Sequence, residues 1–379
     1  MVFALPYSSL SNQHYMKRIL PFLLLPLILA LQCKKTDKTA ATTTGSTVDL
    51  QVSVLASGLH HPWEILWGPD NFIWMTEREG RISRVNPTNG SITPLITIPD
   101  VVAQGEGGLL GMVLHPDFSS TAQVFVVYNY TSSSGYREKV VRYSYDGTTL
   151  VNPITILSGI NASTIHNGSR LLIIDHKLYI STGDAANSSN SQSTTSLNGK
   201  LLRVNLDGTI PGDNPLPGNP YWTYGHRNAQ GMVFANNRIY ISEHGPTSDD
   251  EINIIEKGKN YGWPMVEGPC NANDEQNHCT LNTDPIKAWT PTIAPCGMDY
   301  YNSNQIVQWK NSLLLTTLKN ARLYQLKLDA NFTGVSSVNE YFVNDYGRLR
   351  DLCISPAGTV YISTSNGGHN DKIIAVKAK

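Results

Sequence analysis

Ile73-Trp74-Met75-Thr76 is the stretch that decides the fold, because similar short runs of apolar and aromatic residues recur along the chain. Runs rich in β-branched and aromatic residues are typical of β-strands. The other copies are Val124-Phe125-Val126-Val127, Leu178-Tyr179-Ile180-Ser181, Ile239-Tyr240-Ile241-Ser242, Leu313-Leu314-Leu315-Thr316 and Val360-Tyr361-Ile362-Ser363. A second run of alternating residues follows each copy: Arg81-Ile82-Ser83-Arg84-Val85, Val140-Val141-Arg142-Tyr143, Lys200-Leu201-Leu202-Arg203-Val204, Glu251-Ile252-Asn253-Ile254, Arg322-Leu323-Tyr324-Gln325-Leu326 and Lys372-Ile373-Ile374-Ala375-Val376.

Six copies of this unit predict an all-β fold, a six-bladed β-propeller with four-stranded antiparallel blades. The copies are spaced by about 50 to 75 residues, which suits one blade with its loops. The dipeptides Asn89-Gly90, Asp146-Gly147 and Asp207-Gly208 are hairpin signals between the units. Residues 48–56 are expected to supply a strand that completes the last blade and closes the ring. A β-sandwich does not require six similar units, and a right-handed β-helix has a much shorter period, so both alternatives are disfavoured.

The composition agrees with a globular chain of many short strands. Hydrophobic residues make up 40% and charged residues 16%, which favours a large core over disorder. The formal net charge of −1 gives no electrostatic reason to expect nucleic acid or an anionic membrane surface as a partner.

Residues 1–33 are expected to be an export segment that is not part of the fold. Met16-Lys17-Arg18 is basic, and the apolar run at 19–31 is too short for a comfortable membrane span. Cys33 directly after the run indicates a bacterial lipoprotein in the periplasm or at the cell surface, while a soluble signal peptide with an incidental Cys33 is left open. Residues 1–15 are left open as lying upstream of the true start. Residues 34–48 are predicted to be a flexible tether and residues 49–379 the propeller.

The remaining cysteines fit an oxidising compartment, in which disulfides persist. Cys270 and Cys279 close a short polar loop and are the expected pair. Cys296 and Cys353 either pair or stay as small buried apolar residues. No spacing of cysteines and histidines suggests a zinc site.

Two polar segments are candidates for a site in the central channel, which the innermost strands and the loops of one face line in a propeller. Gly225-His226-Arg227-Asn228-Ala229-Gln230-Gly231 has more hydrogen-bond donors than a turn before a strand needs. The run at 242–253 presents the Gly245 and Pro246 carbonyls ahead of several carboxylates, and hard oxygen ligands of this kind suit Ca²⁺. A solvated acidic turn explains the second segment equally well.

Four cations predict an anionic ligand in the same channel. Arg348 and Arg350 are two residues apart, so on a strand both guanidiniums would point to one side. Lys319 stands at the corresponding place of the preceding blade, and Arg227 adds a fourth charge. Burying so many cations without an anion is costly, so a multiply charged anion is the simplest ligand. For any one of these residues alone, an ordinary surface position is the simpler interpretation.

His166 is a candidate general base, because it stands in a polar Gly-containing loop immediately before an apolar strand. A structural role is equally compatible with that position. The Gly-rich run at 104–111 lacks the spacing of a phosphate-binding loop. It leaves open either close approach to a ligand or a tight inner turn.

Taken together, the motifs resemble the soluble PQQ-dependent aldose dehydrogenases of the glucose/sorbosone dehydrogenase family. They occur in the family's order from about residue 55 to the end of the chain, and the overall length is similar to the compact aldose sugar dehydrogenase branch. The motifs are GEGGLLGMVLHPDF (105–118), HNGSRL (166–171), GKLLRVNLDGTIP (199–211), YGHRNAQGM (224–232), EHGPTSDDEIN (243–253), KNYGWP (259–264), PTIAP (291–295) and GRLRD (347–351).

The resemblance implies pyrroloquinoline quinone (PQQ) and Ca²⁺ in the channel, and oxidation of an aldose at C1 to the lactone. Carried over by motif, His166 would take the C1 hydroxyl proton and Arg227 would stabilise negative charge on the quinone oxygens. The residues that would hold PQQ are Asn228, Thr292, Lys319, Arg348 and Arg350. The Gly245 and Pro246 carbonyls would bind the Ca²⁺ that acts as a Lewis acid, and Glu251 and Tyr261 would bind a further structural Ca²⁺.

Two positions depart from the loop-rich glucose enzymes. Glu106 stands in place of a substrate-contacting Gln, and Ile165 stands in place of an Asp before the histidine. The implied partners are an aldose sugar and an external electron acceptor such as a quinone, a cytochrome or a dye, and a homodimer is left open. The alternative is a non-catalytic extracellular propeller that binds a glycan or a protein partner. A metal-dependent lactonase is disfavoured, because no Glu, Asn and Asp set in the blade strands matches one.

Overall fold

The computed structural model describes residues 47–272 and 275–379. The predictions for the export segment at 1–33, its lipid anchor at Cys33 and most of the tether at 34–48 therefore lie outside the described residues. The described residues belong to one compact unit, Gly45–Lys379. Within them, no helix combines the length and the apolar character needed to cross a bilayer.

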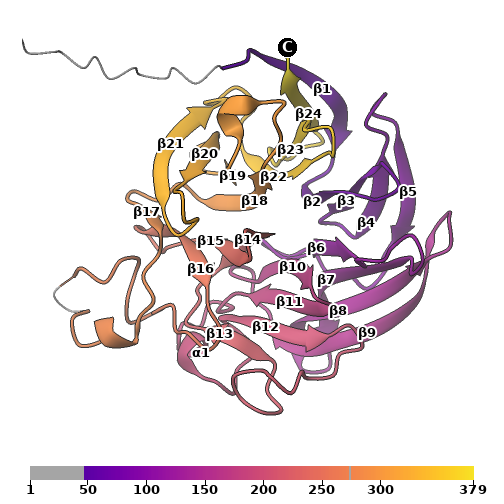
Figure 1. Ribbon diagram of the computed structural model, residues 1–379. Helices are drawn as coiled ribbons and strands as arrows, with labels where there is room; N and C mark the ends of the chain where they lie inside the picture. Colours follow the sequence, from indigo (N-terminus) through magenta and orange to yellow (C-terminus); the bar gives the residue numbers. More distant parts are fainter. Residues whose placement is uncertain (1–46, 273–274) are drawn as a thin grey trace, which may run out of the picture. The chain divides into compact units, whose positions relative to one another are not determined.

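Six four-stranded antiparallel sheets form a ring around a central axis (Figure 1), which confirms the predicted six-bladed propeller. From inner to outer strand, the first two blades are β2 (Pro62–Trp67), β3 (Ile73–Glu77), β4 (Arg81–Val85) and β5 (Ile92–Thr97), then β6 (Leu109–Leu114), β7 (Gln123–Ser132), β8 (Gly135–Tyr145) and β9 (Leu150–Asn161). The next two are β10 (Gly168–Ile174), β11 (Lys177–Thr182), β12 (Lys200–Asn205) and β13 (Tyr221–Tyr224), then β14 (Ala229–Ala235), β15 (Arg238–Glu243), β16 (Asp250–Ile255) and β17 (Lys287–Trp289). The last two are β18 (Pro295–Tyr301), β19 (Ser312–Thr317), β20 (Leu323–Leu328) and β21 (Val335–Tyr341), then β22 (Leu349–Ile354), β23 (Val360–Thr364), β24 (Asp371–Ala378) and β1 (Leu50–Leu59).

The repeated runs that predicted the fold are the second and third strands of each blade. These strands are covered on both sides: β3, for example, is buried along its whole length. Continuous burial requires continuous apolar sequence, which is why these strands stand out in the chain. Helical structure among the described residues is short, comprising α1 (Ser189–Gln192) and two 3₁₀ turns, η1 (Cys279–Leu281) and η2 (Val307–Trp309).

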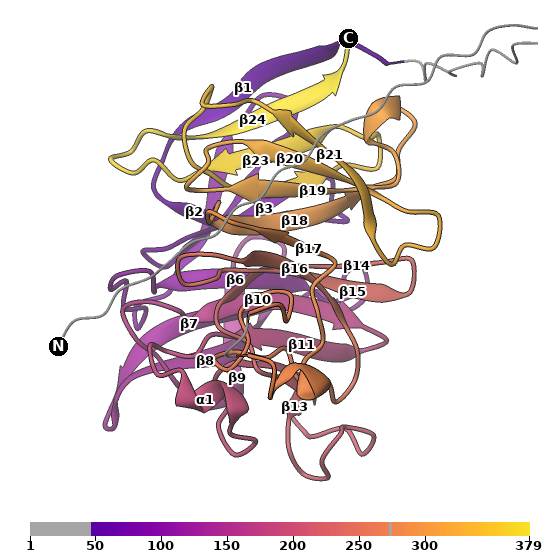
Figure 2. The ribbon, with the colours of Figure 1, turned by 90° about the vertical axis from the view of Figure 1, so that its left-hand side faces the viewer.

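The ring is closed by pairing the N-terminal strand with the C-terminal one. β1 lies beside β24 in both Figure 1 and Figure 2. The two strands are antiparallel, with Leu50 opposite Ala378 and Leu59 opposite Asp371. Ala56 and Leu59 of β1 are buried in the core between the last and the first blade. The predicted closing strand at 48–56 is therefore correct in kind, although it begins and ends later than expected.

Glycines let the inner strands approach one another closely around the axis. A Cβ on Gly111 of β6 would collide with the Ser169 carbonyl of β10, and a Cβ on Gly231 would collide with the Cys296 carbonyl of β18. The Gly-rich run at 104–111 is a tight inner turn, because Gly105 adopts φ +60° against Thr164. These contacts leave a narrow channel in which side chains from different blades meet.

The four cysteines of the propeller form one disulfide and leave two thiols free, which is one of the two arrangements that the sequence allows. Cys270 and Cys279 form a disulfide in the loop between β16 and β17, as predicted. Cys296 and Cys353 are unpaired and buried on the inner strands β18 and β22.

Candidate active site

The loops that enter the inner strands hold most of the residues singled out from the sequence. His166 precedes β10, Arg227 and Asn228 precede β14, Thr292 precedes β18, and Arg348 precedes β22. Inner strands of a propeller run side by side along the axis, so their starts meet at one end of the channel. The functional residues predicted from separate motifs are thereby brought to a single face of the ring.

His166 is held by two carboxylates. Its Nδ1 lies 2.9 Å from Asp184 Oδ1, and its backbone N–H donates to Glu106 Oε2 at 3.1 Å. The residue adopts φ 58°, a left-handed conformation that is uncommon outside glycine. With Nδ1 facing a carboxylate, the ring proton belongs on Nδ1, which leaves Nε2 as the basic nitrogen.

Asp184 joins His166 to the neighbouring loops. Its Oδ2 accepts a hydrogen bond from Trp263 Nε1 at 2.9 Å, and its backbone N–H donates to the Arg227 carbonyl at 2.8 Å. The Arg227 guanidinium in turn lies over the Trp263 ring, 5.3 Å from its centroid. Asp184 therefore fixes the histidine and the tryptophan through its carboxylate and the arginine segment through its backbone N–H.

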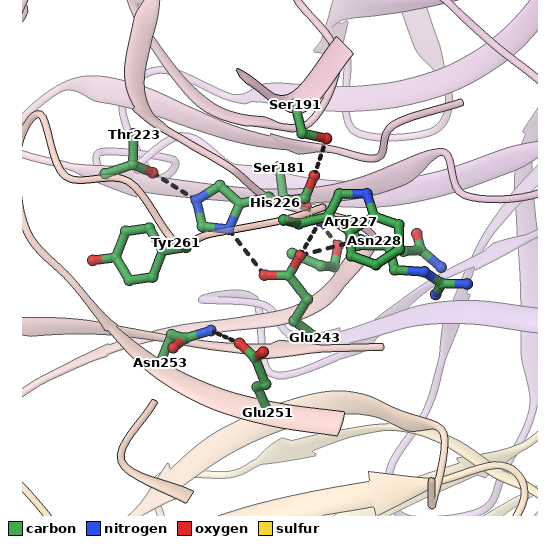
Figure 3. Close-up of polar contacts among 12 residues, drawn as sticks. Ser181, Ser191, Thr223, His226, Arg227, Asn228, Glu243, Glu251, Asn253 and Tyr261 are labelled. Atoms are coloured by element: carbon green, nitrogen blue, oxygen red, sulfur yellow. Dashed lines mark hydrogen bonds and ion pairs between the residues drawn. The ribbon is translucent and has the colours of Figure 1, made fainter. Parts of the chain in front are cut away.

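Glu243 organises the segment that carries Arg227 and Asn228 (Figure 3). Its Oε1 accepts the backbone N–H groups of Arg227 and Asn228, the latter at 3.2 Å. Its Oε2 faces His226 Nδ1 at 2.9 Å, and His226 Nε2 contacts Thr223 Oγ1 at 2.8 Å. This buried chain holds the backbone of Arg227 and Asn228 in place.

Positive groups surround His244. Burial, together with the charges of Arg350 and Arg227 and the neighbouring His166, lowers the pKa of His244 to about 3, so this imidazole is neutral. The Nε atoms of Arg227 and Arg350 and the Nε2 of His244 are all buried and make no hydrogen bond to other described residues. Two buried guanidinium N–H groups without partners, beside a neutral imidazole, suit an anionic ligand.

Arg348 and Arg350 occupy different settings. Arg350 is 8% exposed, and its Nη1 donates to Gln230 Oε1 at 2.9 Å. Arg348 lies outside β22 and is exposed, with its Nε donating to the Ser365 carbonyl at 3.1 Å. The pairing register also shifts between Leu349 and Asp351, so the simple alternation assumed from the sequence does not hold there.

Lys319 and Thr292 lie together at the same mouth. Lys319 Nζ donates to Thr292 Oγ1 at 2.6 Å, and Lys319 itself is exposed. Buried Asp250 fixes the backbone beneath them, because its Oδ2 accepts the N–H groups of Ile293 and Ala294. Asp250 Oδ1 also accepts the Gly245 N–H at 2.8 Å, which ties the Gly245 loop to this segment.

The four residues predicted to bind metal line one small cavity of about 10 Å³, close to the space that a single water needs. Its lining includes Gly245, Pro246, Glu251 and Tyr261, together with Glu243, Asp249 and Glu267. Burial and the nearby charge of Glu243 raise the pKa of Glu251 to about 8. A buried carboxylate destabilised by its neighbours fits a cation at this position, and the donor set of carboxylate and carbonyl oxygens suits Ca²⁺.

Arg170 closes the channel below the site. Its Nη1 lies 2.5 Å from Glu64 Oε1 and 3.1 Å from Asp351 Oδ2, and its guanidinium covers the Trp63 ring at 4.4 Å. Glu64, Arg170 and Asp351, with the later parts of the inner strands, line a cavity of about 310 Å³. The candidate active site therefore has a floor of charged groups that bond one another.

Sequence reasoning missed Asp184, Glu243 and Trp263 as parts of the site. A usable signal exists for the acids, because Glu243 follows the repeated run 239–242 directly and Asp184 follows the run 178–181 closely. Trp263 was visible only as part of the motif KNYGWP. Its contact with Asp184 joins residues 79 positions apart, which local patterns do not reveal.

Comparison with known proteins agrees with this geometry. Residues 59–374 match the family model described as Glucose / Sorbosone dehydrogenase. The chain is 32% identical to an aldose sugar dehydrogenase of Escherichia coli K12, covering 90% of this chain and 95% of that protein. It is 31% identical to quinoprotein glucose dehydrogenase B of Acinetobacter calcoaceticus, covering 84% and 86% respectively.

Among solved structures, the PQQ-bound form of an aldose sugar dehydrogenase from Streptomyces coelicolor superimposes with a TM-score of 0.77 at 33% identity. That match covers 88% of this chain and 99% of the other. The family model spans most of the propeller and includes every candidate site residue. The chain therefore belongs to the glucose/sorbosone dehydrogenase family.

Proposed function

We propose that this protein oxidises an aldose sugar at C1 to the corresponding lactone, with PQQ and Ca²⁺ as cofactors and an external electron acceptor. The observation that carries the proposal is the set of buried cationic donors around His244, next to a histidine whose basic nitrogen is free. The S. coelicolor relative is described in a PQQ-bound form, and the E. coli relative is named an aldose sugar dehydrogenase.

PQQ carries three carboxylates, which suit the cations of this mouth. Arg350 and Arg227 offer buried N–H groups without partners, and Lys319 and Arg348 offer exposed charges at the rim. Asn228 and Thr292 would complete the holding set from neighbouring blades. Bound PQQ would supply a two-electron acceptor for the hydride from the sugar C1, and the electrons would then leave to the external acceptor.

The chain itself supplies the base and the electrostatic environment. His166 Nε2 takes the proton of the C1 hydroxyl, and Asp184 stabilises the resulting imidazolium through its contact with Nδ1. Arg227, fixed by Glu243 and Trp263, provides positive charge that needs no reorganisation during the reaction. Glu106 stands beside His166 and would contact the sugar.

Gly245 and Pro246 would bind the catalytic Ca²⁺ through their carbonyls, and Glu251 and Tyr261 line the same cavity, whose size fits one ion rather than two. Export to an oxidising compartment, anchored at Cys33, remains part of the proposal. The disulfide between Cys270 and Cys279 supports export, because such bonds are rare where thiols are kept reduced.

Activity is tested by adding PQQ and Ca²⁺ to the chelator-treated full chain and following aldose-dependent reduction of a dye. The proposal predicts activity only when PQQ and an aldose are both present. His166→Gln should lower kcat by about 10²–10⁴-fold, the usual worth of general base catalysis. His176→Gln, at an exposed histidine of the β10–β11 turn, is the matched control and should leave kcat unchanged.

The possible failures can be told apart by a direct PQQ titration. Tight PQQ binding without turnover of any aldose would exclude the sugar chemistry but leave the cofactor site intact. No PQQ binding at all would exclude the cofactor assignment as well.

A further inference from the structure

We propose that His60, His61 and Glu79 form a binding site for a divalent transition-metal ion such as Zn²⁺, on the same face of the ring as the candidate active site. One ligand atom from each of these residues lies within 4.8 Å of the other two. Two imidazole nitrogens and a carboxylate oxygen are ligands that Zn²⁺ commonly takes, and three protein ligands leave a position for water.

The side chains converge on one point. His60 Nδ1 lies 3.0 Å from Glu79 Oε2, and His61 Nδ1 lies 2.8 Å from Glu79 Oε1. Each carboxylate oxygen therefore faces a different imidazole. Without a metal, the His61 contact is a hydrogen bond, and an ion replaces its proton when it binds.

The backbone is shaped to place two consecutive histidines on one side. Successive residues of an extended chain point to opposite faces, but His61 adopts φ 45°, which breaks that alternation. The two backbone N–H groups are anchored on buried carboxylates: His60 donates to Glu77 Oε1 at 2.8 Å and His61 donates to Asp371 Oδ2 at 3.2 Å. These anchors come from β3 and β24, so two blades fix the positions of the ligands before a metal arrives.

The surroundings leave room for an ion and its water. A cavity of about 270 Å³ lies against the site and is lined by His60, Glu79 and His369, among others. His369 stacks on His60 with ring centroids 4.2 Å apart, which holds that imidazole in its plane. Arg81 lines the same cavity, but its guanidinium is paired with Glu77, so its charge is balanced locally.

The site is joined to the candidate active site by one residue. Arg78, next to Glu79, donates from Nη2 to the Gly107 carbonyl at 3.0 Å and also bonds the Gly105 carbonyl. These two carbonyls flank Glu106, which holds the His166 backbone N–H. A metal on Glu79 therefore lies beside the loop that carries Glu106.

A second group of potential ligands provides an internal comparison. His115, Asp117 and His176 also cluster, but His176 Nε2 lies 3.7 Å from Asp117 Oδ2, and both side chains are more than half exposed. His115 Nδ1 already accepts the Asp117 backbone N–H at 3.1 Å. This group is looser and has one nitrogen occupied, so it should bind Zn²⁺ more weakly.

The proposal is tested by titrating the full chain, saturated with Ca²⁺, with Co²⁺ and then displacing Co²⁺ with Zn²⁺. The expected Co²⁺ complex has a visible spectrum typical of a low coordination number with nitrogen ligands. Zn²⁺ should bind at one site more tightly than at any other. His60→Gln and His61→Gln should each weaken that site at least tenfold, because even the loss of a residue that only supports a ligand costs about 10–100-fold. The double variant His115→Gln, His176→Gln is the matched control and should keep the site.

Thermal unfolding gives a second readout. Zn²⁺ should raise the Tm of the unaltered chain and of the control but not of His61→Gln, since an ion that binds only the folded state stabilises it. If a histidine variant folds poorly, Glu79→Gln tests the same site, because this side chain is 38% exposed and its substitution should not disturb the fold. The proposal would be overturned if the unaltered chain bound no Zn²⁺. It would also be overturned if the variants at His60, His61 and Glu79 bound Zn²⁺ with the same affinity and stoichiometry as the unaltered chain.

Discussion

Under the proposed function, Asp184 supports catalysis through its contact with His166 Nδ1. Its Oδ1 accepts from His166 Nδ1 and from the Ala186 backbone N–H, and its Oδ2 accepts from Trp263 Nε1. An amide has one oxygen and no charge. Asp184→Asn therefore leaves at least one of these donors unpaired and removes the negative charge that would stabilise a His166 imidazolium.

Asp184→Asn should therefore lower kcat by about 10²–10⁴-fold under the proposed function. Trp263→Phe keeps the carboxylate and removes only the indole N–H that donates to Asp184 Oδ2. Its kcat should fall by less than about tenfold, because the change removes one hydrogen bond. Steady-state kinetics on both PQQ-loaded variants make the comparison. An Asp184→Asn protein that folds and keeps its kcat would show that His166 does not depend on this carboxylate.

Glu243 should tolerate an amide but not an apolar residue. In Glu243→Gln, the oxygen still accepts from Arg227 and Asn228, and the NH₂ group faces His226, which can change tautomer and donate to Thr223 instead. In Glu243→Leu, buried donors are left without partners at about 1–3 kcal/mol each. Denaturant unfolding should show a loss of several kcal/mol for the Leu variant and little loss for Gln; equal losses would contradict this account.

Glu138 makes stability depend on pH. Burial raises its pKa to about 8 from an ordinary 4.5, and Ser169 Oγ contacts its Oε2 at 2.6 Å. Between these two pKa values the folded chain binds a proton that the unfolded chain has released, so the folded state loses stability as the pH rises through this range. Glu138→Gln mimics the protonated acid and has no such loss.

The two proteins should be about equally stable near pH 5 and should diverge towards pH 9. The Gln variant should gain on the order of a few kcal/mol, at about 1.4 kcal/mol per pKa unit. Urea unfolding of both proteins at each pH measures the difference directly. A difference that stays constant with pH would mean that Glu138 is ionised in the folded protein.

At the scale of the elements, β1 is the strand that locks the ring. Deleting residues 1–59 would expose the edge of β24 and remove Ala56 and Leu59 from the core, at about 1.5–3 kcal/mol for the leucine alone. The expected result is a large fall in Tm or aggregation through the open edge. Deleting residues 1–46 is the control, because no described strand contains them, and it should leave the Tm of the propeller unchanged.

The blade strands were predictable because both faces of each middle strand are buried. β3 and β7 therefore carry continuous apolar runs that stand out from the rest of the chain. The inner strands were harder to find, since their channel faces carry polar residues such as Glu64 and Arg170. Strand ends differed as well, as for β20, which begins at Leu323 and extends beyond the predicted run.

At the scale of the whole molecule, the six starts of the inner strands bring distant motifs to one mouth. Residue types and the cation cluster were predictable, because each motif is polar where packing alone would not require it. The contacts between distant residues were not predictable. Arg170 and Asp351, for example, are 181 residues apart and meet only because the ring closes. The same holds for His61 and Asp371, which meet across the seam between the last blade and the first.

The measurement that bears most directly on the central claim is calorimetric titration of PQQ into the chelator-treated full chain with Ca²⁺ restored. The account predicts one PQQ per chain, and a large loss of affinity in Arg350→Met, because Arg350 Nε is buried without a partner in the channel. Arg142→Met, on β8 of the second blade, should bind as the unaltered chain does. PQQ binding that is absent, or that Arg350→Met leaves unchanged, would contradict the account.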